Sequence, residues 1–268
     1  MGGMIRYDLR QGIWKNIGWF LPVVYFPLSF FVKIRQIMAL PFTEPPKALG
    51  LTDLVFAFFA GMEPYHPGPG QVFDPPIQWL LVFFYLSFLI SLYPAADMKK
   101  YGRNLMIRVK SRETYWYGKC LWTFLTTALY YGLLLLLLAA CLPVGGKYAP
   151  GLHGDAAALL SGVFIDTEPE GAELFVLAAP FLTLLSLSLL QNLLSFILSP
   201  VYSFMVNVAL IVCSAFFNTS LCAGQIAMFK RSFIAGGDVS WPHLFIPALL
   251  SAASVLAGSL YFKRKDIL

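Results

Sequence analysis

The sequence contains few charged residues. Asp, Glu, Lys and Arg make up 12% of its 268 residues, against about 25% in a soluble globular domain. Apolar residues make up 58%, and the mean hydropathy is +0.70. The composition excludes an ordinary soluble domain and predicts an integral membrane protein.

Sequence motifs for nucleotide binding and for metal binding are also missing. The P-loop pattern is absent, since 145–147 (Gly-Gly-Lys) lacks the first glycine at its spacing and the Ser or Thr. The three histidines, His66, His153 and His243, form no H-E-x-x-H and are expected to be solvated rather than to bind a metal. We therefore expect no catalytic residue, no metal and no cofactor in this chain, which is predicted not to be an enzyme.

The four cysteines show no C-x-x-C spacing and lie in or at the ends of apolar runs. They are expected to be small core residues. Cys141 and Cys222 both fall near the same predicted face, and the sequence leaves open whether they pair. It also leaves open whether 1–3, before a second methionine at Met4, is a cloning scar.

Six apolar runs reach the length of about 20 residues that a membrane-spanning helix needs. They lie at about 13–32, 77–96, 120–142, 173–198, 201–222 and 243–262. The sequence therefore predicts an all-α polytopic membrane protein with a single transmembrane domain over 1–268.

Two amphipathic or short apolar stretches accompany the runs. Ile5, Leu9 and Ile13 recur at i, i+4 and i+8, which predicts an N-terminal helix in the membrane interface. The apolar stretch 49–62 is too short to span, and it predicts a re-entrant or surface-lying helix.

The basic residues are unevenly distributed between the connections. The segments 1–15, 97–119 and 263–268 hold 13 of the 19 Lys and Arg. By the positive-inside rule these segments are cytoplasmic, as are both termini, whereas 33–76 and 143–172 are extracellular. Membrane orientation thus explains the net charge of +5 better than nucleic-acid binding does.

The connection 97–119 is the predicted working surface. Seven of the Lys and Arg lie here, and at 100° per residue Met98, Tyr101, Leu105 and Val109 fall within about 80° of one another. The pattern predicts a short amphipathic cytoplasmic helix that breaks near Ser111. The charges alone are equally explained by retention of the loop in the cytoplasm, but retention does not require an apolar stripe.

A polar stripe marks the run 173–198. Its members lie within about 100° of one another on a helical wheel: Ser188, Gln191, Asn192, Ser195 and Ser199. Interhelical hydrogen bonding, with Asn207 as the expected partner, is the favoured interpretation, and a wall that contacts substrate is the alternative.

Two stretches carry a family resemblance. They are 105–112, followed by Trp116 and Lys119, and the ending 261–267. With the six-run layout, they make the chain resemble an ABC-2 type permease, the transmembrane subunit of a bacterial ATP-binding-cassette exporter. The long outer segments, which follow the first and third runs rather than the fifth, depart from many relatives.

The resemblance implies that the chain functions together with other subunits. Two permease subunits, identical or homologous, would enclose a pathway in the bacterial plasma membrane, and each would dock an ABC ATPase that binds ATP and Mg²⁺. The implied docking residues are Met98, Tyr101, Arg103, Leu105, Arg108, Val109 and Arg112. The cargo stays open between a peptide, a drug-like molecule and a lipid.

Two other functions remain as alternatives. A secondary transporter would respond to an ion gradient, although no charged residue lies in the middle of any run. A non-transporting immunity or sensing subunit would bind a ligand through its outer segments.

Overall fold

The computed structural model describes residues 2–40, 46, 48–65, 68, 73–97, 111–144, 147–165, 169–219 and 222–264. Within these residues every regular element is a helix, and two isolated β-bridges join Leu49 with Tyr148 and Ser232 with Val239. The prediction of an all-α protein is confirmed.

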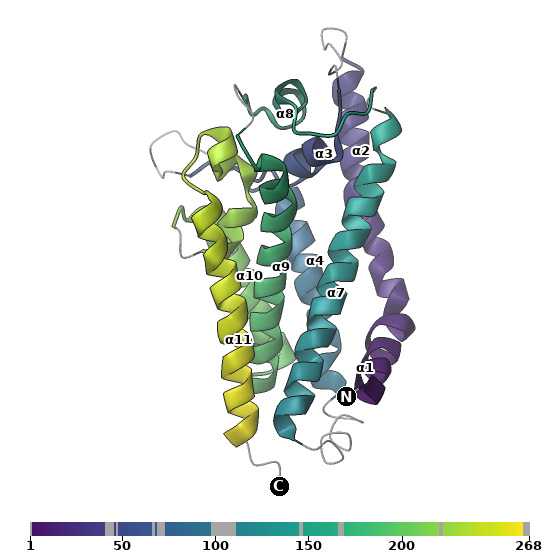
Figure 1. Cartoon of the computed structure of the whole chain (residues 1–268), viewed down its shortest axis with the longest axis vertical. Helices are drawn as coiled ribbons and strands as arrows, with labels where there is room; N and C mark the ends of the chain where they lie inside the picture. The colour runs from purple at the N-terminus through teal and green to yellow at the C-terminus, as the bar shows by residue number, and fades with distance from the viewer. Residues whose placement is uncertain are drawn as a thin grey trace.

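Six apolar helices form the body of the molecule (Figure 1). Four of the described helical segments are long and apolar enough to cross a membrane, and two are shorter. The long ones are Ile5–Met38, α7 (Arg112–Ala140), α9 (Ala172–Ile197) and Trp241–Arg264, which ends in α11 (Phe245–Arg264). The shorter ones are α4 (Ile77–Leu92) and α10 (Pro200–Phe216). The chain is a polytopic membrane protein.

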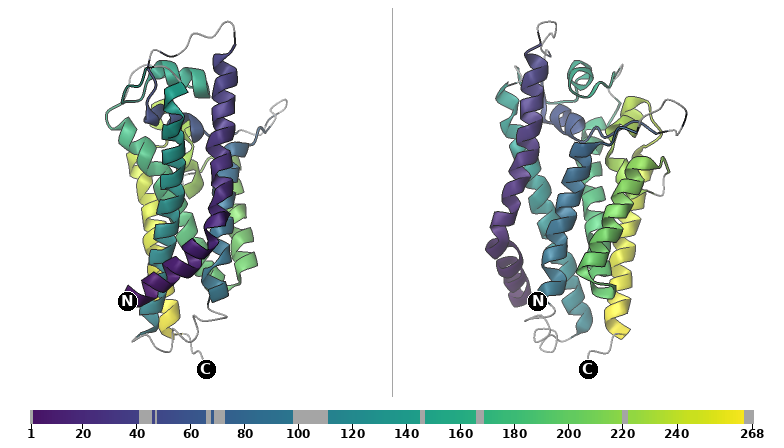
Figure 2. Two further views of the ribbon diagram at one scale, coloured as in Figure 1. Left: turned by 90° about the vertical axis from the view of Figure 1, so that its right-hand side faces the viewer. Right: turned by 180° about the vertical axis from the view of Figure 1, so that it is seen from behind.

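Successive helices run in alternating directions along the long axis (Figures 1 and 2). Residue Gly2, the start of α7 and the end of α11 therefore lie at one end of the bundle, which we call the terminal end. The other end is covered by shorter helices, and we call it the cap end. α9 lies at the centre, packed against α4, α7, α10 and α11.

The first helix differs from its prediction. It runs from α1 (Gly2–Asp8) through a π-turn, η1 (Leu9–Ile13), and a 3₁₀ segment, η2 (Trp14–Val24), to α2 (Tyr25–Met38). The expected end at residue 32 is wrong, because no helix breaker follows until Pro41. The backbone departs from helical angles inside this segment at Asn16. The part of the chain that precedes this irregularity lies obliquely to α2 (Figure 2, left).

Three other boundaries need correction. Pro94 ends the second helix early, since α4 stops at Leu92 and a single turn, α5 (Pro94–Asp97), follows. The third helix begins at Arg112 rather than at 120, because Ser111 caps it. α10 stops at Phe216 rather than at 222, where the chain turns back into the cap.

The cap end is built from short helices. They are α3 (Leu51–Phe58), α8 (Gly154–Ser161), η5 (Ala223–Ala227), η6 (Phe229–Arg231) and η7 (Phe233–Ala235). α3 is buried from Thr52 to Phe58 against α7, α8 and α9, so the surface-lying alternative is wrong, whereas the re-entrant alternative stays a prediction. Its faces are almost all apolar, and a helix apolar all round is stable only inside a core.

Candidate functional site

A fully buried lysine lies at the terminal end. Lys119, in the second turn of α7, places its Nζ 2.6 Å from Oδ1 of Asp8 and 2.7 Å from Oδ2 of Asp97. Asp8 ends α1 and Asp97 ends α5, and both carboxylates are almost completely buried. We call Asp8, Asp97 and Lys119 the charge cluster. It joins three segments that are far apart in the sequence.

Tyrosines surround the charge cluster. The hydroxyl of Tyr93 donates to Asp8 Oδ1 at 2.7 Å, and the Tyr115 hydroxyl approaches Asp97 Oδ2 at 3.5 Å. The Lys119 ammonium lies 4.7 Å from the Tyr93 ring centroid and 5.1 Å from that of Tyr115. Aromatic faces and carboxylates together replace the water that the ammonium lost on burial.

The charge balance of the cluster is unusual. Two carboxylates face one ammonium, and the second oxygen of Asp8, Oδ2, is buried without a hydrogen-bond partner in the described part of the chain. Removing one partner from a buried ion pair typically costs about 3–5 kcal/mol, because the other charge is then left uncompensated. The relative placement of α1, α5 and α7 is therefore strongly coupled.

The predicted docking face is described only at its end. Six of its seven residues, Met98, Tyr101, Arg103, Leu105, Arg108 and Val109, lie outside the described residues. Arg112 is the first residue of α7 and is partly buried. Residues 112–119 form the first two turns of α7 rather than a separate connection, because Ser111 Oγ accepts from the Thr114 amide and the helix starts there.

Trp116 attaches the start of α7 to α11. Its indole Nε1 donates to the Val255 carbonyl at 2.8 Å, and its ring stacks on Phe262 with centroids 5.5 Å apart. Gly258 faces the ring so closely that a Cβ at this position would overlap it. Both stretches that carry the family resemblance therefore contribute to this contact, although the sequence pattern did not predict that they meet.

The polar stripe on α9 lies inside the bundle, with one exception. Ser188, Gln191, Asn192 and Ser195 are buried. Ser199 instead caps α10, accepting from the Tyr202 amide, and so does not belong to the stripe. The helix ends at Ile197 and the chain turns there, which moves Ser199 away from its wheel position.

The stripe residues bond to three neighbouring helices. Gln191 Nε2 donates to the Ser87 carbonyl on α4 at 2.7 Å. Asn207 Nδ2 on α10, the expected partner, donates to Gln191 Oε1 at 2.8 Å and to Ser87 Oγ at 2.5 Å. Asn192 Nδ2 donates to Thr123 Oγ1 on α7 at 3.0 Å. We call these five residues the polar seam. Its bonds connect α4, α7, α9 and α10.

A buried carboxylate at the cap end forms hydrogen bonds with two separate parts of the chain. Asp53 is fully buried on α3 and accepts from the Gly50 amide at 2.8 Å and the His153 amide at 2.6 Å. Its Oδ2 also lies 2.8 Å from Nδ1 of His153, so the expectation of a solvated His153 is wrong. Burial raises the pKa of the Asp53 carboxyl above its ordinary value, and the bonds from His153 and Gly50 oppose that shift. Sequence reasoning missed this pair, whose members are 100 residues apart.

A buried arginine closes the end of α10. Arg231 donates to the carbonyls of Ser214 at 3.1 Å, Ala215 at 2.6 Å and Met62 at 3.2 Å. A cation at a helix C-terminus satisfies carbonyls that have no partner within the helix. Arg231 lies between the fifth and sixth predicted runs, a connection that falls on the same side as 33–76 and 143–172 when the runs alternate in direction. A basic residue on the extracellular side needs another explanation, and this was the available signal.

No cluster of three or more His, Cys, Asp or Glu that would hold a metal occurs in the described part of the chain. Cys120, Cys141, Cys213 and Cys222 are all free thiols, so Cys141 and Cys222 are not paired here.

The fold and the buried polar contacts define a polytopic α-helical membrane protein. The chain belongs to the family described as protein of unknown function (DUF2705), which matches residues 52–268. No curated protein and no solved structure matches the chain.

Proposed function

We propose that this chain is the membrane-spanning permease subunit of an ATP-driven exporter of the ABC-2 type. The supporting observation is the charge cluster. Asp97 immediately precedes the predicted docking segment, and Lys119 follows it on α7. Asp8 adds the N-terminal helix to the same ion pair. A force applied to the docking segment would thus act on α1, α4 and α7 together.

The arrangement of the connections supports the same function. The start of α7, the short turn between α9 and α10, and the described chain ends all lie at the terminal end (Figure 1). In the proposed orientation this end is cytoplasmic, where an ATPase has access to it. Rigid-body tilting of α4 and α7 would then open the pathway towards the cap end.

The polar seam fits helix packing better than a substrate wall. Each of these hydrogen bonds joins two protein groups, and the side chains of the seam are buried. In the proposed assembly the pathway would therefore be enclosed between two permease subunits rather than within one chain. ATP and Mg²⁺ would bind only to the partner ATPase, and the chain itself would not be an enzyme.

Co-purification tests this proposal. The chain is expressed with its genomic neighbours in a bacterial host, purified in lipid nanodiscs and analysed by mass spectrometry. We expect an ABC ATPase in the complex, a second permease subunit, and ATP-dependent transport after reconstitution into proteoliposomes. Transport driven by an ion gradient without ATP would contradict the proposal and favour a secondary transporter. Ligand binding without transport would favour a sensing or immunity subunit.

A further inference from the structure

Two adjoining cavities open at the cap end. One has a volume of about 420 Å³ and the other about 430 Å³. Gly61, Asp74, Pro76 and Lys230 line both, so the two cavities adjoin, and we call them together the cap cavity. Each part falls within the size range of about 300–1,000 Å³ that is typical of small-molecule sites.

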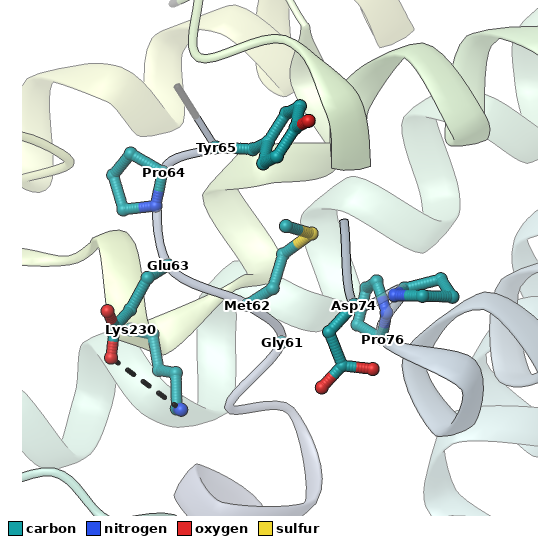
Figure 3. A pocket seen from close by; sticks show the side chains of 9 residues that line it. Gly61, Met62, Glu63, Pro64, Tyr65, Asp74, Pro76 and Lys230 are labelled. Carbon is teal, nitrogen blue, oxygen red and sulfur yellow. Dashed lines mark ion pairs between the residues drawn. The ribbon is translucent and has the colours of Figure 1, made fainter. Parts of the chain in front are cut away.

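Charges of both signs surround the cap cavity. Lys230 and Lys33 contribute ammonium groups, and Glu63 and Asp74 contribute carboxylates. Figure 3 shows Asp74 on one side of the segment that carries Gly61, and the Glu63 and Lys230 side chains on the other. A ligand in the cavity would therefore meet the ammonium of Lys230 and the carboxylate of Asp74 from different sides.

In the described part of the chain, these charged groups form no close ion pair with one another. The one ion pair among them in the described part of the chain joins Lys230 Nζ to Glu63 Oε1 at 3.9 Å. That separation exceeds the ~2.7–2.9 Å of a charge-assisted hydrogen bond. Asp74 and Lys33 have no ion pair among the described residues. The groups remain available to a ligand, which distinguishes this cavity from the charge cluster, where the ion pairs are 2.6 and 2.7 Å long.

A side-chain donor without a partner also lines one of the two cavities. Gln78 lines the larger cavity, and its Nε2 is buried without an acceptor in the described part of the chain. Buried amide donors normally have a partner, and leaving one unpaired costs about 1–3 kcal/mol. Trp79 and Tyr65 supply aromatic surface nearby. A carbonyl or anionic oxygen of a ligand would satisfy the Gln78 amide.

We propose that the cap cavity binds a small zwitterionic ligand of the size of a short peptide. The anionic end of the ligand pairs with Lys230 and Lys33, its ammonium pairs with Asp74, and an internal carbonyl accepts from Gln78. A ligand with one charge only would leave the oppositely charged wall without a partner. The headgroup of phosphatidylethanolamine carries the same pair of charges and is the other source of this chemistry.

Calorimetry with defined probes tests the proposal. The purified chain is placed in phosphatidylglycerol nanodiscs, which contain no amine, and titrated with trialanine, N-acetyl-trialanine and trialanine amide. We expect trialanine to bind and each singly capped form to bind about tenfold more weakly or worse, since each loses a charge-assisted contact. Glycerophosphoethanolamine is titrated in parallel. If it binds and trialanine does not, the zwitterion site stands and its ligand is a lipid headgroup.

Variants locate the binding. Lys230→Gln and Asp74→Asn should each weaken trialanine binding about tenfold. Lys147→Gln and Asp238→Asn remove the same charges from cap-end residues outside the cavity and should leave binding unchanged. Gln78→Leu should raise the melting temperature of the free protein, because it removes an unpaired donor, and should still weaken binding. Equal binding of capped and uncapped peptides, or no binding of any probe, overturns the proposal.

This inference is independent of the proposed permease function. Binding is measured on the chain alone, without an ATPase. Failure of the titrations would leave the co-purification result untouched, and absence of an ATPase would leave the cavity as a ligand site.

Discussion

Lys119 Nζ lies 2.7 Å from Oδ2 of Asp97, so residues on either side of the predicted docking segment form a direct ion pair inside the protein. The segment between them is thereby anchored at both ends to helices of the bundle. Asp8 shares the same ammonium at 2.6 Å. Movement at one of these three positions must be accompanied by movement at the other two, or an ion pair is broken.

We predict that removing the cation of the charge cluster lowers the stability of the protein strongly, and that removing both carboxylates as well restores it. Lys119→Met leaves two buried carboxylates without a cation and should lower the free energy of unfolding by about 3–5 kcal/mol. Adding Asp8→Asn and Asp97→Asn to that variant should restore most of the loss, because no buried charge then remains. Thermal unfolding in nanodiscs measures the effect. Lys263→Met, on the exposed last turn of α11, is the control, and an equal effect in both single variants would contradict the prediction.

We predict that charges introduced into the docking face uncouple the chain from the ATPase. Tyr101→Asp with Leu105→Asp introduces two charges into the expected apolar contact, and the desolvation cost should abolish ATPase co-purification and transport. The control, Tyr148→Asp with Phe164→Asp, likewise replaces a tyrosine and a second apolar side chain, at exposed cap-end positions. It should assemble normally. Normal assembly and transport of the first variant would place the docking site elsewhere.

The polar seam predicts energetic coupling between two helices. Gln191→Leu and Asn207→Leu should each destabilise the protein, and a double-mutant cycle should give a coupling of about 0.6–1.7 kcal/mol, the range of membrane-buried hydrogen bonds. Asn192→Leu with Asn207→Leu is the comparison. Those residues share no direct hydrogen bond in the structure, so their effects should add. In a reconstituted transporter these variants should transport different substrates in the same order of preference as the parent. A changed order of preference with an unchanged melting temperature would assign the seam to the pathway.

The contact between α7 and α11 predicts opposite effects at two glycines. Gly258→Ala places a methyl group against the Trp116 ring and should destabilise the protein by about 1–3 kcal/mol through overpacking. Gly132→Ala on α7 meets nothing within 4 Å. It should stabilise the protein by about 0.5–1 kcal/mol, since alanine is the better helix former. Two variants of equal melting temperature would contradict the packing seen here.

The Asp53 and His153 pair predicts a pH dependence. Because burial raises the pKa of Asp53 in the folded protein, the folded state holds the proton more tightly than the unfolded chain does. The stability that this proton contributes is present below the unfolded pKa of about 4 and is lost as the pH rises through the higher folded value. Asp53→Asn should remove this part of the profile of melting temperature against pH. Asp155→Asn, an exposed carboxylate at the start of α8, should retain it.

The sequence by itself determined the class of protein and most helix positions. Runs of about 20 apolar residues have one stable form in lipid, the helix, because every backbone group must be paired internally. The same local logic identified Asn207 as the partner of the stripe on α9.

Only the tertiary structure decided where the charged residues lie. Asp8 and Lys119 are 111 residues apart, and Lys119 was expected in water because it follows a basic stretch. Local hydropathy cannot detect such a pair: a buried charge is tolerated only when a distant segment brings the opposite charge, and that depends on how helices pack. The same reason applies to Arg231, whose carbonyl partners come from residues 62–63 and 214–217.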